Sequence, residues 1–454
     1  SAPNDYKAIV CLFLFGGNDS ANMVLPTDTA SWSTYTTVRN QAPDPIALRP
    51  VGTAADPNAA NATPAALGGV LGLTPAYTIN PGNSSRGFAL HPSMPEVRQL
   101  FNTDARLAIL ANAGPLVQPL TKAQFRANSA PRPAKLFSHN DQQSTWQALS
   151  AEGARVGWGG RLGDLMASRN GSNTLFTNIS ASGNAVFLAG DSVFQYQVSG
   201  NGSVQVGGIT GNLFGSAEAA RQLRSLITAD TYSNLYAREY ATITKRSIDA
   251  QAAFQAAFTP SIVAAPTQVN LPSTRLNANN GLAQQLQTVA RIIGARQTLG
   301  TNRQIFFVSM GGFDTHDNQN RVHADLMARL SHALGYFDAT LGTLGVRNQV
   351  TLFTASDFGR TFTSNGDGTD HGWGAHHFVM GGAVRGREVV GRFPTIGLNQ
   401  DDEVGSGNLI PGLSVDQIGA TLGRWFGATD SNLDLVFPNL RNFGTGRDLG
   451  FLRA

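Results

Sequence analysis

The sequence predicts an α/β protein in which helices flank a mainly parallel central sheet, with an inserted hairpin and helical region. Three observations lead to this prediction. Residues 8–15 form an unbroken apolar run, which is typical of a strand buried on both faces of a parallel sheet. In the last third of the chain, apolar strands alternate with amphipathic helices, as in βαβ units. Finally, 41% of the residues are hydrophobic, which supplies a core.

The elements of the N-terminal half follow from apolar runs, capping residues and turn signals. We expect strands at residues 8–15 and 106–111 and helices at residues 92–102 and 138–149. Ser138 is a suitable N-cap for the second helix. Residues 41–86 are rich in Ala, Pro, Asn and Gly, which predicts a long surface excursion. The short apolar runs and the Gly-Asn-Gly turn within residues 185–206, with one run at 186–188, predict antiparallel hairpins.

The remaining elements are read in the same way. We expect helices at residues 217–258, 282–299, 320–344 and 415–426 and strands at residues 304–310 and 350–355. Ser414 and Gln417 have the spacing of a capping box, and Gly300 and Gly427 are suitable helix ends. We therefore predict one α/β domain over residues 1–454, in which residues 180–280 form an insertion.

Composition excludes several classes of protein. One cysteine, Cys11, cannot form an internal disulfide, a cysteine-based zinc site or an iron–sulfur cluster. A net charge of +3 without a basic run argues against a nucleic-acid partner. The longest apolar run is far shorter than the roughly 20 residues that span a bilayer. The start Ser1-Ala2-Pro3 fits a chain whose export leader has been removed and equally a chain shortened in another way, and of these two we expect an exported protein.

The histidines are unevenly placed, and they define the candidate site. Of the 8 histidines, most fall late in the chain, at His316, His323, His332, His371, His376 and His377. Asp314 and His316 follow one predicted strand, Asp357 follows another, and a third loop carries Asp370 and His371. We expect these loops to meet at the carboxyl edge of the sheet, together with Asp19 after the first strand. Mixed imidazole and carboxylate ligands favour Zn²⁺, Mn²⁺ or Fe²⁺ over Ca²⁺.

Other residues are open to two interpretations. Ser138 is either a hydroxyl nucleophile at a helix N-terminus or only a helix cap. His323 and His332 lie on a predicted helix, where we expect structural roles. His376 and His377 begin an apolar strand, so one is expected to point inward and the other away. Neither a phosphate-binding P-loop motif nor a G-x-S-x-G nucleophile motif is found in the sequence.

The motifs that carry these residues resemble a known family. They are Gly16-Gly-Asn-Asp-Ser20, Ser138-His139, Gly311-Gly-Phe-Asp-Thr-His316, Ser356-Asp-Phe-Gly-Arg-Thr361 and Gly368-Thr-Asp-His-Gly372. In this order they resemble the bacterial secreted proteins called domain of unknown function 1501, over residues 6 to at least 394. The resemblance implies the fold of the alkaline phosphatase and sulfatase superfamily. It also implies twin-arginine export to the periplasm or the extracellular space.

The resemblance further implies roles for individual residues. The metal ligands would be Asp19, Asp314, His316, Asp357 and His371. Ser138 would be the nucleophile, with His139 beside it, and Arg360 would grip the oxygens of an anionic ester. Substrate would be bound by Asn18, Asp370, His376 and His377.

The sequence also departs from the superfamily pattern. The motif of formylglycine sulfatases is not matched, because Ser129-Ala-Pro-Arg132 has its arginine one position early and Cys11 lies inside a strand. Phe358 stands where the superfamily has a metal-binding histidine, and the Asp314-to-His316 spacing is shortened. These differences predict a site with one metal or with unusual geometry.

Three functions remain open from the sequence. The first is a secreted metal-dependent hydrolase of phosphate or sulfate esters, acting on a small molecule or an extracellular polysaccharide. The second is a non-haem iron enzyme that uses Asp314, His316 and His371 as ligands. The third is a non-catalytic carbohydrate-binding or assembly protein that presents Phe194 and Tyr196. The substrate, the metal and the oligomeric state are not determined by the sequence.

Overall fold

The computed structural model describes residues 5–203, 216–229 and 235–454. A ten-stranded sheet forms the centre of the molecule, in the order β14-β5-β13-β12-β1-β11-β6-β7-β8, with β15 also paired to β5. Its strands are β1 (Lys7–Leu14), β5 (Leu107–Gly114), β6 (Asn178–Ser180), β7 (Tyr196–Ser199), β8 (Gly202–Ser203), β11 (Arg303–Met310), β12 (Val350–Ser356), β13 (Ala375–Met380), β14 (Val389–Val390) and β15 (Leu413–Ser414). Only β13 and β8 run against the others, so the predicted mainly parallel sheet is confirmed.

The first strand lies in the middle of this sheet because its residues are apolar on both faces. β1 pairs in parallel with β11 on one side and with β12 on the other. Val10 and Leu12 pack into one hydrophobic core, whereas Ile9 and Cys11 pack into a second core on the opposite face. Parallel strands need helical crossovers, so each face of the sheet is covered by helices.

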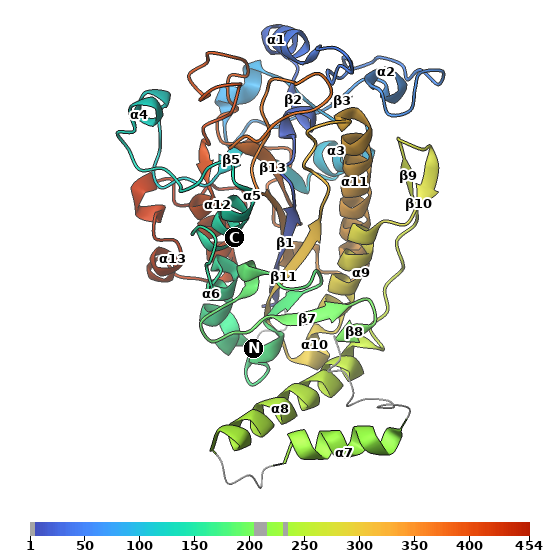
Figure 1. Cartoon of the computed structure of the whole chain (residues 1–454), viewed down its shortest axis with the longest axis vertical. Helices are drawn as coiled ribbons and strands as arrows, with labels where there is room; N and C mark the ends of the chain where they lie inside the picture. Colours follow the sequence, from blue (N-terminus) through green and yellow to red (C-terminus); the bar gives the residue numbers. More distant parts are fainter. Residues whose placement is uncertain (1–4, 204–215, 230–234) are drawn as a thin grey trace.

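Helices form the two outer layers (Figure 1). The face that contains Val10 is covered by α3 (Pro95–Asn102), α9 (Gly281–Gly294) and α11 (Gln319–Thr343). The other face is covered by α5 (His139–Ala148), α6 (Trp158–Met166), α12 (Val415–Phe426) and α13 (Asp430–Val436). The capping box of Ser414 and Gln417 starts α12 as predicted, and α10 (Arg296–Leu299) ends at Gly300 as predicted. No helix in the described part of the chain is long and apolar enough to cross a membrane.

Smaller elements surround the sheet. Three of them are the helices α1 (Thr29–Arg39), α2 (Pro64–Leu67) and α4 (Lys122–Ala127). One small sheet consists of β2 (Val24–Pro26), β3 (Leu71–Gly72) and β4 (Phe88–Leu90). A second small sheet consists of β9 (Val269–Leu271) and β10 (Leu276–Ala278). The predicted helical region at 217–258 consists of α7 (Ala217–Ile227) and α8 (Leu235–Phe258), which extend beyond one end of the sheet (Figure 1). Whether residues 180–280 are an insertion stays a prediction.

The predicted hairpin region is partly confirmed. β7 and β8 form an antiparallel hairpin at one edge of the central sheet. The prediction of a strand at 186–188 is wrong, because these residues form a short 3-10 helix packed against α6. The rest of the region, from residue 204, lies outside the described residues. Phe194 is 75% exposed, whereas Tyr196 packs against the rings of Phe176 and Phe254.

His376 and His377 face opposite sides of β13, against Phe393 and Trp146, but the prediction that one of them points away from the core is wrong, because both faces of β13 are buried. His376 accepts a hydrogen bond from the Asn112 amide at 3.0 Å, and His377 Nδ1 lies 3.0 Å from Thr354 Oγ1. Burial lowers the pKa of each ring to about 3. Both rings are therefore neutral parts of the core near neutral pH.

These buried histidines predict a loss of stability in acid. In the unfolded chain a histidine has a pKa of about 6.5, so below that pH the unfolded state binds more protons and the folded state loses stability. The free energy of unfolding is expected to fall by about 1.4 kcal/mol per pH unit for each such histidine. Urea unfolding at pH 7, 6 and 5 measures this slope. His377→Gln should reduce the slope by the contribution of one histidine, and parallel curves for both proteins would contradict the prediction.

Candidate metal centre

The candidate site lies at the carboxyl edge of the three central strands. The loop after β1 contains Gly16, the loop after β11 contains Asp314, and Asp357 directly follows β12. His371 lies in the loop before β13, and His139 is the first residue of α5. The edge is where open α/β sheets bind their ligands.

Glycine at position 16 allows two of these loops to touch. Gly16 has a φ of +117°, and a Cβ on it would lie 2.5 Å from the backbone nitrogen of Asp314. Its own amide donates to Asp357 Oδ1 at 3.0 Å. A side chain at this position would therefore separate the β1 loop from the Asp314 loop.

Three imidazole rings are held through their Nδ1 atoms. His139 Nδ1 lies 2.7 Å from Asp357 Oδ2, and His371 Nδ1 lies 2.9 Å from the carbonyl oxygen of Phe137. His316 Nδ1 lies 3.0 Å from Asp370 Oδ1. Carboxylate and carbonyl oxygens only accept hydrogen bonds, so each Nδ1 carries the proton. A ring that carries its single proton on Nδ1 presents the lone pair of Nε2.

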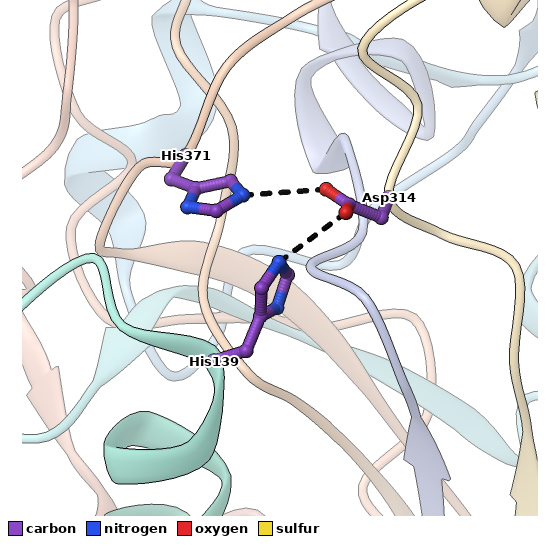
Figure 2. Close-up of side chains that lie close together, drawn as sticks. All are labelled: His139, Asp314 and His371. Atoms are coloured by element: carbon purple, nitrogen blue, oxygen red, sulfur yellow. Dashed lines mark hydrogen bonds and ion pairs between the residues drawn. The ribbon is translucent and has the colours of Figure 1, made fainter.

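These Nε2 atoms converge on one carboxylate. Asp314 lies 3.3 Å from Nε2 of His139, 3.3 Å from Nε2 of His371 and 2.9 Å from Nε2 of His316. Figure 2 shows His139 and His371 directed at the two oxygens of Asp314. One ligand atom from each of His139, Asp314 and His371 lies within 4.8 Å of the others.

The tautomers explain what this arrangement can bind. Nε2 of His316 and Nε2 of His371 are 3.1 Å apart. Two lone pairs facing each other and a carboxylate repel unless a cation or a proton lies between them. Imidazole nitrogens together with one carboxylate form a donor set of the kind used for zinc and other divalent transition metals. Metal-binding histidines usually have such a hydrogen bond at the other ring nitrogen, which fixes the ring for the metal.

Arg360 binds the carboxylate of Asp314 from its buried side. Its buried guanidinium pairs with Asp314 and also donates to the carbonyl oxygens of Gly16, Gly17 and Phe313. Partial burial raises the pKa of Asp314, but the hydrogen bond and the charge of Arg360 outweigh that effect and keep the pKa below its ordinary value. Arg360 is therefore engaged inside the protein, and the anion-gripping role implied by the resemblance stays a prediction.

Comparison with known proteins places the chain in a family. A family model described as "Protein of unknown function (DUF1501)" matches residues 6–432. The chain belongs to this DUF1501 family. No curated protein sequence matches it.

Several solved structures are similar to the DUF1501 chain. The sulfatase PsFucS1 from Pseudoalteromonas sp. is 10% identical, with 99% of this chain and 74% of that chain covered and a TM-score of 0.34. The lipoteichoic acid synthase LtaP from Listeria monocytogenes is 9% identical, with 96% and 78% covered and a TM-score of 0.34. Ps i-CgsB is 11% identical, with 77% and 71% covered and a TM-score of 0.33.

Asp357 of the DUF1501 protein contacts Nδ1 of His139, whereas Nε2 of the same ring faces Asp314. It is fully buried and accepts hydrogen bonds from the Gly16 amide, His139 and Gln143 Nε2, the last at 2.8 Å. Both of its oxygens are thus used within the protein, and one of them positions His139. Phe358 packs against the rings of His139 and His371, at centroid distances of 4.8 and 4.6 Å. The rings are therefore fixed from the side as well as through Nδ1.

Asp19 is held in a separate buried ion pair. Arg39 binds both oxygens of Asp19, at 2.6 and 2.9 Å, and Gln319 donates to it at 2.6 Å. Burial raises the pKa of Asp19, but the charge and hydrogen bonds of Arg39 lower it further, so the carboxylate stays ionised. Asp314 is paired with a different arginine, Arg360, so the two carboxylates are neutralised separately.

The remaining candidate residues are distributed around the cluster. Asn18 Oδ1 lies 2.9 Å from Nε2 of the buried His323, and Ser138 Oγ donates to Asp141 Oδ2 at 2.7 Å. Asp370 holds His316, and its side chain is 63% exposed. His376 and His377 lie within the core strand β13.

Sequence reasoning missed three contributions to the site. The resemblance gives His139 a catalytic role, yet its Nε2 lies among the potential metal ligands. Gln143 is not singled out by any motif. A signal was present, because His139 and Gln143 are four residues apart on α5 and such residues share one helix face. The carbonyl group of Phe137 carries no sequence signal.

Proposed function

We propose that this DUF1501 protein is a metal-dependent hydrolase of phosphate or sulfate esters. The observation that carries the proposal is the convergence of three imidazole Nε2 atoms on Asp314, each ring being fixed through a protonated Nδ1. Such a preorganised donor set is costly to leave without a cation or a proton, because the nitrogen lone pairs and the carboxylate repel one another.

His139, His371 and Asp314 would hold the metal, with His316 as a further nitrogen donor. Nitrogen-rich ligands favour Zn²⁺, Mn²⁺ or Fe²⁺, whereas Ca²⁺ prefers sites made of oxygens alone. When bound, a divalent metal supplies Lewis acidity toward an ester oxygen and lowers the pKa of a water molecule. We propose one such ion, because Asp19 is already neutralised by Arg39.

The protein's own residues prepare the site for this chemistry. Asp357 and the Phe137 carbonyl keep the two rings in one tautomer and one orientation. Arg360 fixes the Asp314 carboxylate from its buried side. Asp314 and His316 are each 44% exposed, so a substrate can approach from the opposite side.

Ser138 remains the proposed nucleophile. It precedes His139 at the N-terminus of α5, where the helix dipole favours a developing alkoxide. Its hydroxyl proton is held by Asp141. By resemblance to the secreted family, we further propose a periplasmic or extracellular location and, as one class of substrate, esters on a polysaccharide.

Metal removal tests the proposed function. After chelation, the protein is expected to hydrolyse no member of a panel of aryl phosphate, phosphodiester and aryl sulfate esters. Reloading with Zn²⁺, Mn²⁺ or Fe²⁺ should restore turnover of at least one ester with close to one ion bound per chain. Ser138→Ala distinguishes the hydroxyl from a water nucleophile, since full turnover by that variant would exclude Ser138. A metal-loaded protein that turns over no ester on the panel would refute the hydrolase.

A non-haem iron enzyme is the second candidate. His139, His371 and Asp314 make up two imidazoles and one carboxylate, which is the ligand set of iron-dependent oxygenases. Iron in the purified protein, with substrate-dependent oxygen uptake and no ester turnover, would select this function.

A further inference from the structure

A cavity that lies away from the metal centre contains an acidic side chain with which no cationic side chain of the described residues is paired. The cavity has a volume of about 180 Å³, well above the roughly 10–15 Å³ that one water requires. The segment after β5, the C-terminal end of α5 and the N-terminal end of α12 enclose it. Asp416, the second residue of α12, lines the cavity and is only 2% exposed.

Other buried acids show how this protein normally satisfies a carboxylate. Asp19 is paired with Arg39, Asp338 with Arg106 and Arg347, and Glu403 with Lys122 and two backbone amides. Glu388 accepts hydrogen bonds from Thr78 and Ile79. A buried carboxylate without such partners pays a large desolvation penalty.

Asp416 differs from these acids. Within the described part of the chain, its carboxylate accepts one hydrogen bond from another residue, the Asn439 amide at 3.3 Å, and no cationic side chain pairs with it. Arg132 also lines the cavity, but its guanidinium lies over the ring of Phe125, 4.7 Å from the centroid. Burial raises the pKa of Asp416 to about 7, and the hydrogen bonds from the backbone amides of Asn439 and of Asp416 itself only partly oppose this effect.

The cavity walls indicate the kind of cation that would complete the site. Leu116, Val117 and Leu149 provide apolar surface, and Thr145 and Ser150 provide hydroxyl groups nearby. A small inorganic ion would find few oxygen ligands there, whereas an alkylammonium ion matches both the carboxylate and the apolar walls.

We propose that this cavity is a binding site for a small organic ammonium ion, with Asp416 as its counter-ion. The ammonium group would donate hydrogen bonds to the carboxylate of Asp416, and the alkyl part would contact Leu116, Val117 and Leu149. Arg132 is the other charged residue of the lining, and its guanidinium lies over the ring of Phe125. The site is independent of the proposed hydrolase, because no residue of the metal centre lines this cavity.

Titration of the full chain with n-propylammonium chloride at pH 8 tests the proposal by calorimetry and thermal unfolding. We expect saturable binding that weakens about tenfold for each pH unit below 7, because protons compete for the carboxylate. Propan-1-ol, propionate and KCl should not bind. Asp416→Asn should abolish the effect, whereas Asp430→Asn, an exposed first-turn acid of α13, should retain it.

The outcomes that would overturn the proposal are equally specific. They are no binding of propylammonium by the wild-type protein at pH 8, equal binding by folded Asp416→Asn, or equal binding of KCl. Because the neutral amide introduced by Asp416→Asn resembles the protonated acid, the variant is expected to fold, and circular dichroism would verify this. The result does not depend on ester turnover, so it is separate from the fate of the proposed function.

Discussion

Replacing Asp314 by Asn is expected to release the metal and, with it, ester turnover. The loss of a residue that only orients a metal ligand lowers metal affinity by about 10- to 100-fold, so the loss of a charged ligand should exceed 100-fold. Asn keeps a carbonyl oxygen for Arg360, which preserves the local hydrogen bond. Metal content after dialysis and the metal concentration for half-maximal turnover measure the effect.

Asp317→Asn is the matched control for this variant. Asp317 lies three residues further along the same loop and is exposed. The same charge is removed, yet metal content and turnover should stay at the wild-type level. An Asp314→Asn protein that retains a full equivalent of metal would disprove the assignment of Asp314 as a ligand.

Replacing Arg39 by Met is expected to destabilise the protein by about 3–5 kcal/mol, because the change leaves the charge of Asp19 buried without its counter-ion. Arg39 and Asp19 are both almost fully buried, with side-chain exposures of 0% and 1%. Denaturant unfolding of the wild type and the variant measures the difference in free energy. A double variant, Arg39→Met with Asp19→Asn, removes both charges and should recover most of the loss.

Arg98→Met provides the control for the Arg39 substitution. Arg98 is an exposed residue of α3, and surface changes of this kind alter stability by about 0.5 kcal/mol or less. If divalent metal fully restored the stability of Arg39→Met, Asp19 would instead be acting as a metal ligand. That result would return Asp19 to the role that the family resemblance implies.

Local signals were sufficient for most elements of the fold. The apolar run of β1, the capping box of Ser414 and Gln417, and the glycine after α10 each act within a few residues, and each was confirmed. The predictions that were wrong concern residues whose structure depends on packing against distant parts of the chain. Residues 186–188 are apolar enough for a strand, but they pack against α6 as a 3-10 turn. Both His376 and His377 are buried because each face of β13 is covered, by Phe393 over His376 and by Trp146 over His377.

Part of the candidate site could also be predicted from local sequence signals. Acidic residues after two parallel strands had to reach one edge of the sheet, and Asp314 and Asp357 do so. The sequence did not show that Asp314 and Asp357 take different positions at this edge. Asp357 is bound by His139, which is 218 residues away in the sequence. Periodicity and spacing carry no information on which of two carboxylates at one edge faces the rings and which lies behind them.

By itself, then, the sequence determined the sheet, its helical layers and the edge at which aspartate and histidine gather, because hydrophobic periodicity and capping act locally. Tertiary structure decided how the charges are distributed. It paired Asp19 with Arg39, set Asp357 behind His139, directed three Nε2 atoms at Asp314, and buried Asp416 beside a cavity. The physical reason is that desolvation and hydrogen bonding of a carboxylate depend on neighbours that come from distant parts of the chain.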